Sequence, residues 1–569
     1  MKNTIKKFMA LALAALICCP MAACGDPDDE NGANEKIDPH RTQLYVYNFY
    51  GGYGSDWLSA AKLRYEELHK DDIYEDGKKG IQIYINNQKT AIMGLSGQIL
   101  DNRDEVYFTE YAYYYTLKNE GVLGDISEAV TKPLEEYGES RSIKDKMSRD
   151  QQAYYGVGEG DEAKYYAVPH YAGYSGLIYN IDLFEEEGYY FAKTPSDNTR
   201  EGRFIDKFNT VRSAGPDGEF GTSDDGLPAT YEEFFVLCDF IADNGQTPII
   251  WNGANYKDYL NNLTQALIAD YEGLDQMMLN YTLNGTATSL SKISGGNLVA
   301  DEAPTAVKET DAWQLARQAG KYYGLSFLEK LVTTDGYHNK LAFNGGYSHM
   351  NAQEDFLYAG YDGKTKPAAM LCDGCWWEME AKDTFTAMEA SKGEKFSKYE
   401  RNFGFMPLPK ATAEKATENV SKEKKNTLYD EIYSICFMKA NVADWKKPLA
   451  LDFIRFVNSD ESLREFTSVT NTVKALDYTM SKEEKEKLTP FGKSLMELKE
   501  KSDVVYPYST NSVYANNQAF FGTHESFRST VSTNYQWPAE ALHENGITAA
   551  QYFAGMETYY RNNWASLLK

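Results

Sequence analysis

The chain has 569 residues, which is long for one domain and predicts at least two. Its formal net charge of −26 makes the surface repel phosphate backbones, so a nucleic-acid partner is not expected. No apolar run approaches membrane-spanning length, so no transmembrane helix is expected either.

The amino-terminal residues 1–23 are expected to be an export signal. Three lysines precede an apolar run at 8–19 that is too short to span a membrane. The sequence Met-Ala-Ala-Cys that ends at Cys24 resembles the lipobox of bacterial lipoproteins. The resemblance implies cleavage before Cys24 and a lipid anchor on the outer face of the cytoplasmic membrane; the alternative is an ordinary signal with a chance cysteine. Residues 24–41 hold few apolar side chains and are expected to form a flexible tether.

Strand-like runs followed by helical periodicity occur three times after the tether. The strands are expected at 43–48, 80–86 and 105–109. Connections of a dozen or more residues predict a parallel α/β sheet, and ligands of such sheets bind beyond the carboxyl ends of the strands. The loops expected to face one crevice are 49–57, 86–89 and 109–114.

Further strands and helices follow in the remainder of the chain, which shows no internal repeat. Residues 444–569 are expected to be mostly helical. The further strands are expected at 176–180, 247–251, 366–373, 402–409 and 431–438.

Four segments, in order, resemble the extracellular solute-binding proteins of carbohydrate ABC importers, the group that includes maltose-binding protein. They are the strand, glycine loop and tryptophan-bearing helix at 44–63; YYAVPHYAGYSGLIYNIDLF at 165–184; AAMLCDGCWWE at 368–378; and 403–409 with 433–439. The resemblance implies an α/β periplasmic-binding-protein-like fold of two lobes, closing on a sugar in the cleft between them. It does not cover the segments near 190–228 and 280–310 or the helical carboxyl-terminal region.

The order of segments implies how the chain is divided between the lobes. The first lobe is expected to hold residues 42–170 and 366–430. The second is expected to hold 171–365 and 431–569, with a helical carboxyl-terminal part.

Aromatic residues at strand ends and crossovers are the candidates for stacking on a sugar. The chain has 44 tyrosines, whose flat apolar face and hydroxyl suit sugar rings. Trp251 and one of Trp376 and Trp377 are the leading candidates, with Trp251 and Trp376 expected on different lobes; each aromatic has the alternative of packing in the core. The other aromatic candidates are Tyr50, Tyr53, Tyr111, His170, Tyr171 and Tyr174, and the candidates for hydrogen bonds to hydroxyls are Glu110, Asn252 and Asp373.

The segment 215–226, GPDGEFGTSDDG, concentrates carboxylates and glycines in twelve residues. Calcium takes six to eight oxygen ligands, and glycines permit the tight turns that such a loop needs. The spacing does not match an EF-hand, although it is similar to calcium loops inserted in some solute-binding proteins. A structural calcium ion is one interpretation and a solvated acidic turn is the other. The candidate ligands are Asp217, Asp224 and Asp225, with Glu219 or Glu232 as additions.

Four cysteines, Cys238, Cys372, Cys375 and Cys436, remain after the signal and Cys24. They are too few for a disulfide scaffold. Cys372 and Cys375 have redox-motif spacing, which leaves unpaired thiols, a local disulfide, or redox or metal chemistry as alternatives.

No phosphate-loop, zinc-protease or nucleophile-elbow motif is present, and no catalytic residue or required cofactor is expected. The leading hypothesis is a lipid-anchored protein that captures an oligosaccharide and delivers it to an ABC permease and its ATPase. The alternatives are a surface glycoside hydrolase or lyase, and a glycan-tethering lipoprotein without a transporter.

Overall fold

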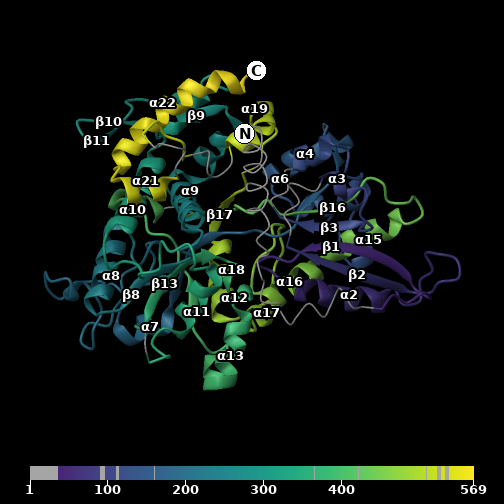
Figure 1. Ribbon diagram of the computed structural model, residues 1–569, viewed down its shortest axis with the longest axis horizontal. Helices are drawn as coiled ribbons and strands as arrows, with labels where there is room; N and C mark the ends of the chain where they lie inside the picture. The colour runs from purple at the N-terminus through teal and green to yellow at the C-terminus, as the bar shows by residue number, and fades with distance from the viewer. Residues whose placement is uncertain are drawn as a thin grey trace, which may run out of the picture.

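The computed structural model shows two α/β lobes side by side (Figure 1). Within the described residues, no helix is both long and apolar enough to cross a bilayer. The export signal and Cys24 lie outside the described residues. The structure describes residues 36–89, 96–110, 114–158, 160–363, 365–420, 422–507, 509–521, 527–531 and 537–569.

The first lobe is built around a sheet with the strand order β2-β1-β3-β16-β6. β1 pairs in parallel with β2 and β3, whereas β16 runs antiparallel between β3 and β6. Most side chains of β1 are buried, as expected for a parallel strand covered on both faces. The strands are β1 (Thr42–Phe49), β2 (Ile81–Gln88), β3 (Val106–Thr109), β6 (Val168–Pro169) and β16 (Ile435–Met438).

Helices α2, α15 and α16 pack on the first lobe. In α15 the buried residues recur three and four apart, which gives the helix one apolar face toward β16. The Ser459 side chain accepts a hydrogen bond from the Ser462 backbone N–H and so caps α16. The bounds are α2 (Asp56–Leu68), α15 (Lys447–Val457) and α16 (Asp460–Thr470).

The second lobe is built around a sheet with the strand order β14-β7-β13-β8. β13 pairs in parallel with β8 and antiparallel with β7. The long helix α9 bends at Gly273, whose φ of 75° lies in the left-handed region. Helices α21 and α22, at the carboxyl-terminal end, pack against α10 (Figure 1). The elements are β7 (Ser175–Asn180), β8 (Thr247–Trp251), β13 (Ala368–Gly374), β14 (Phe403–Phe405), α9 (Tyr256–Thr282), α10 (Ala319–Thr333), α21 (Pro538–Asn545) and α22 (Ala549–Leu567).

Other elements cover the sheets or lie between the lobes. β15 and β17 form a small parallel pair. The bounds are β15 (Asn426–Tyr429), β17 (Ser502–Val505), α6 (Arg149–Tyr155), α7 (Ile181–Glu187), α8 (Tyr231–Asp243), α11 (His349–Tyr358), α12 (Trp377–Glu380), α13 (Lys382–Lys392), α14 (Ala413–Asn419) and α18 (Pro490–Glu500).

Three crossing segments, 170–174, 430–434 and 471–475, connect the lobes and contact one another. The Glu431 backbone N–H donates to the Gly173 carbonyl (3.0 Å), and that of Ala172 donates to the Val473 carbonyl (3.3 Å). A Cβ atom at Gly173 would lie 2.1 Å from Ile432 Cδ1, so only glycine allows these two segments to approach so closely. The crossings therefore form one bonded bridge between the lobes.

The predicted division of the chain between the lobes is wrong for its later segments. β13 and β14, in the segment 366–430 assigned to the first lobe, pair with β7 in the second lobe. β16, in the segment 431–569 assigned to the second lobe, pairs with β3 in the first lobe. The error has a physical cause, because both lobes use the same pattern of strands and helices. The pairing of a strand determines which lobe it belongs to, and sequence periodicity does not reveal that pairing.

Candidate functional site

The candidate site lies at the seam where the ends of strands from the two sheets meet. Glu110 directly follows β3 of the first lobe, while Asn252 follows β8 and Asp373 lies near the end of β13 in the second lobe. All three side chains are buried. Ligands of open α/β sheets bind at such strand ends, which is why the sequence pointed to this edge.

A buried amide joins two carboxylates of the seam. Gln353 of α11 donates through Nε2 to Asp373 Oδ2 (3.0 Å) and to Glu380 Oε2 (2.8 Å). Gln353 Oε1 is buried and has no hydrogen-bond partner within the part of the chain that the structure describes. Glu380 ends α12, so one strand and two helices each contribute one polar group to the cluster.

Glu431 brings the bridge between the lobes into the same cluster. Its Oε1 accepts a hydrogen bond from the Ser175 hydroxyl (2.6 Å), and its buried Oε2 has no partner among the described residues. The charge of Asp373 lies close enough to raise the pKa of Glu431. We call Glu110, Asp373, Glu380 and Glu431 the acidic seam; two of its members follow strands of opposite lobes, and a third lies on the bridge.

Burial raises the pKa of all four carboxyls of the acidic seam, because a charged carboxylate is costly away from water. The pKa of Glu110 is raised to about 8, although the Tyr171 hydroxyl that donates to it opposes the shift. Burial raises the pKa of Glu431 to about 8, and the charge of Asp430 adds to the rise. For Asp373 and Glu380 burial raises the pKa to about 7.

Aromatic residues of the two lobes meet beside the acidic seam. The ring centroid of Tyr53 lies 4.0 Å from that of Tyr171 and 6.5 Å from that of Trp376. The Tyr53 hydroxyl donates to the Ala172 carbonyl of a crossing segment (2.8 Å). A Cβ atom at Gly52 would lie 2.7 Å from the Trp376 ring, so glycine permits this contact between the lobes. Tyr50 and Trp376 are the two predicted aromatics that stay partly exposed here.

The expectation that Trp251 and Trp377 project into the cleft is wrong. Trp251 is fully buried in the second lobe and donates through Nε1 to the Ala342 carbonyl (2.7 Å). Trp377 is fully buried among Phe356, Phe403 and other aromatic rings. Trp251 ends β8 with its indole in the core of the second lobe, and Trp377 turns its indole into the core from the start of α12. Trp251 and Trp376 also follow neighbouring strands of one sheet, not of different lobes.

The remaining predicted aromatics are packing residues of the bridge. Tyr174 is fully buried, and His170 is buried between Trp57 and Phe108. His170 Nδ1 lies 2.7 Å from Lys474 Nζ. Burial lowers the pKa of His170 well below its usual value, and the nearby Lys474 lowers it further. Tyr111 lies outside the described residues.

Sequence reasoning missed Gln353, Glu380 and Glu431. Gln353 sits on a helix that begins with a Ser348 capping box and carries no sign of a binding role. Glu380 and Glu431 are two of many carboxylates in an acidic chain. Only Glu431 carried a sequence signal. It follows Asp430 in a segment between two strands, which is where a chain can cross between lobes.

The acidic loop at 215–226 folds around two buried carboxylates. The Asp217 backbone N–H donates to Asp224 Oδ2 (3.0 Å), and the Lys501 ammonium lies 3.5 Å from Asp217 Oδ2. Glu219 pairs with Lys425, Asp225 accepts from the Gly221 backbone N–H (2.8 Å), and Glu232 lies 3.7 Å from Arg203. No three histidine, cysteine, aspartate or glutamate side chains of the described chain converge as a metal site requires.

Calcium binding by this loop stays a prediction, since calcium takes six to eight oxygens and main-chain carbonyls and water can supply part of them. Calcium bound only to the native state should stabilise it by about 2.7 kcal/mol at a hundredfold excess over Kd. Melting curves with calcium and with a chelator measure this, and Asp224→Asn should remove any difference. If the wild-type melting curves with calcium and with chelator coincide, the loop does not bind calcium and is a solvated acidic turn.

The four predicted cysteines, all within the described chain, are free and buried, so the disulfide alternative is not realised. The Cys375 thiol lies 3.3 Å from the Tyr53 hydroxyl, whereas the Cys372 thiol faces the Tyr259 carbonyl (3.9 Å). The Cys372 and Cys375 side chains are separated because they point toward different parts of the structure at the end of β13. Burial raises the pKa of both thiols.

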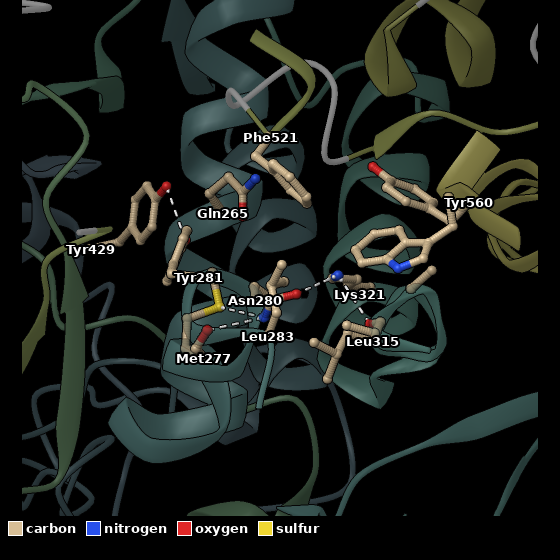
Figure 2. A pocket seen from close by; sticks show the side chains of 13 residues that line it. Gln265, Met277, Asn280, Tyr281, Leu283, Leu315, Lys321, Tyr429, Phe521 and Tyr560 are labelled. Carbon is tan, nitrogen blue, oxygen red and sulfur yellow. Dashed lines mark hydrogen bonds between the residues drawn. The ribbon is translucent and has the colours of Figure 1, made fainter. Parts of the chain in front are cut away.

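Two cavities lie in the second lobe, away from the acidic seam. The first, shown in Figure 2, lies between α9, α10 and α22 and has a volume of about 40 Å³, far below the roughly 300 Å³ of small ligand pockets. Its polar group is Lys321, which donates to Asn280 Oδ1 (2.9 Å) and the Leu315 carbonyl (3.0 Å). The second, of about 260 Å³, lies between the acidic loop and α18.

Comparison with known proteins supports the fold. The chain aligns with a chitin oligosaccharide binding protein over 92% of its own length and 100% of that chain, with 14% identity and a TM-score of 0.53. It aligns with the GacH receptor of Streptomyces glaucescens, solved with acarbose, over 92% and 99% of the chains, with 13% identity and a TM-score of 0.52. No family model matches the chain, and no curated protein matches it. The predicted fold, that of carbohydrate-binding receptors with two α/β lobes, is confirmed.

Proposed function

We propose that this protein binds a carbohydrate between its two lobes and delivers it to an ABC transporter. The observation that carries the proposal is the acidic seam, where buried polar atoms without partners lie between strand ends of opposite lobes, beside partly exposed aromatic rings. Sugar hydroxyls supply hydrogen bonds to such atoms, and sugar rings stack on such aromatic faces. The neighbours of like fold, a chitin oligosaccharide binding protein and an acarbose receptor, support this proposal.

Titration calorimetry with a panel of oligosaccharides tests the binding. We expect saturable heat with at least one sugar and a change of tryptophan fluorescence, because Trp376 lies partly exposed at the seam. The panel should remain chemically unchanged over hours. Steady release of cleaved sugar would favour the hydrolase alternative, which the raised pKa values of Glu110 and Glu380 make worth measuring.

The anchor and the transporter are part of the same proposal. Residues 1–24 support export and lipidation at Cys24, and a surface-bound receptor would meet a permease in the same membrane. We expect Cys24→Ser to move the protein from the membrane fraction to the soluble fraction, or to leave it unprocessed, as fractionation and mass spectrometry would show. A variant that stays processed and membrane-bound would contradict the anchor.

A further inference from the structure

The carboxylates of the acidic seam lack the cationic partners that some other buried carboxylates of this protein have. Asp270 is paired with Lys410 at 2.7 Å, and Glu105 is paired with Lys446 at 2.5 Å. A buried carboxylate without such a partner loses its hydration and gains nothing in return. Within the described ranges, no member of the acidic seam forms an ion pair with lysine, arginine or histidine; its members are Glu110, Asp373, Glu380 and Glu431.

Hydrogen-bond acceptors outnumber donors at this seam. Gln353 uses its amide N–H groups on Asp373 and Glu380, which leaves its own Oε1 without a donor. Glu431 Oε2 has no donor within hydrogen-bonding geometry among the described residues, although the nearby Asn262 side chain lowers the pKa of Glu431. One buried donor, Asn252 Nδ2, has no acceptor in the same part of the chain. The cations nearest to the cluster are Lys89, which is exposed, and His349, whose pKa burial lowers.

A ligand that satisfies this seam must bring positive charge and several N–H or O–H donors. A neutral hydroxyl donates one hydrogen bond and adds acceptors of its own. A primary ammonium donates three hydrogen bonds and accepts none, and it supplies the missing charge. A metal ion does not fit, because three carboxylates do not converge within its reach among the described residues.

We infer that the cleft selects saccharides with free amino groups, which place an ammonium against Asp373 and Glu431 while the sugar ring meets Trp376. The inference rests on the proposed function, because a polyamine also carries ammonium groups and the acidic seam by itself does not distinguish it from an amino sugar. The partly exposed rings of Tyr50 and Trp376 at the same edge favour a sugar, because a sugar ring offers a flat C–H face and a polyamine does not.

Calorimetry on the purified full chain at about pH 6 separates these possibilities; at this pH the entering ammonium takes the place of protons that the carboxyls of the acidic seam hold. The four probes are a glucosamine tetramer, its N-acetylated counterpart, maltotetraose and spermidine. We expect the glucosamine tetramer to bind at least about tenfold more tightly than either neutral tetramer, as one charge-assisted hydrogen bond suffices for such a ratio. Equal or tighter binding of a neutral tetramer would overturn the inference and leave the proposed function standing. Binding of spermidine alone would overturn both, and so would the failure of all four probes to bind.

Two near-isosteric variants, Glu431→Gln and Asp373→Asn, locate the ammonium. Each should lower the ratio of the amino-sugar affinity to the neutral-tetramer affinity by about tenfold. The matched control is Glu378→Gln, which also removes a buried carboxylate near the end of β13, but one that accepts a hydrogen bond from Thr489 (2.9 Å) outside the seam. Melting curves verify folding. An amino-sugar preference that survives in both seam variants, with folding intact, would overturn the assignment.

Discussion

Replacing Trp251 with alanine should destabilise the second lobe by about 3–5 kcal/mol, the usual cost of truncating a buried tryptophan. The indole is fully buried, its ring centroid lies 5.1 Å from that of His338, and its N–H donates to the Ala342 carbonyl (2.7 Å). The variant leaves a cavity and also removes the donor from a buried carbonyl. Urea unfolding followed by circular dichroism would measure the loss.

The matched control for this substitution is Trp445→Ala. Trp445 is 50% exposed, so its removal should change the free energy of unfolding by no more than about 0.5 kcal/mol. Sugar affinity, measured well below the melting temperature of the Trp251 variant, should stay within a few-fold of wild type. A Trp251 variant that unfolds like wild type but no longer binds sugar would return this residue to the binding site.

The strands and helices followed from the sequence wherever burial repeats with a regular period. The strand expected at 247–251 is observed as Thr247–Trp251, and that expected at 43–48 is observed as Thr42–Phe49. The exchange of β13 and β16 between the lobes could not be predicted, since it depends on pairing across long stretches of chain.

The sequence predicts which edge of the sheets carries the site, but not which side chains point into it. Glu110, Asn252 and Asp373 lie at strand ends, and topology alone places strand ends near a ligand. Whether an aromatic at a strand end points to solvent or to the core depends on one step of alternation. At the start of α12, after β13 has ended, one residue along the chain likewise separates Trp376, partly exposed, from Trp377, fully buried. Gln353 and Glu431 reach the seam only through tertiary structure.

Raising the pH should favour an open arrangement of the lobes, because opening would return the carboxyls of the acidic seam to water and release the protons that their burial holds. In this structure the pKa values of Glu110 and Glu431 are about 8 and those of Asp373 and Glu380 about 7, against about 4 in water. A carboxyl whose pKa is raised favours the closed state at low pH, and this contribution is lost as pH rises from about 4 through about 8.

Small-angle scattering of the ligand-free protein should therefore show a larger radius of gyration at about pH 8.5 than at about pH 5.5. The difference in closing free energy is on the order of a few kcal/mol, because each unit of pKa shift corresponds to about 1.4 kcal/mol and the groups are coupled. His349, whose pKa is lowered by burial, acts in the opposite direction at the acidic end of this range. Glu431→Gln cannot ionise at this position, so its radius should change less with pH. A wild-type radius that is constant across this range would show that closure does not depend on protons held by the acidic seam.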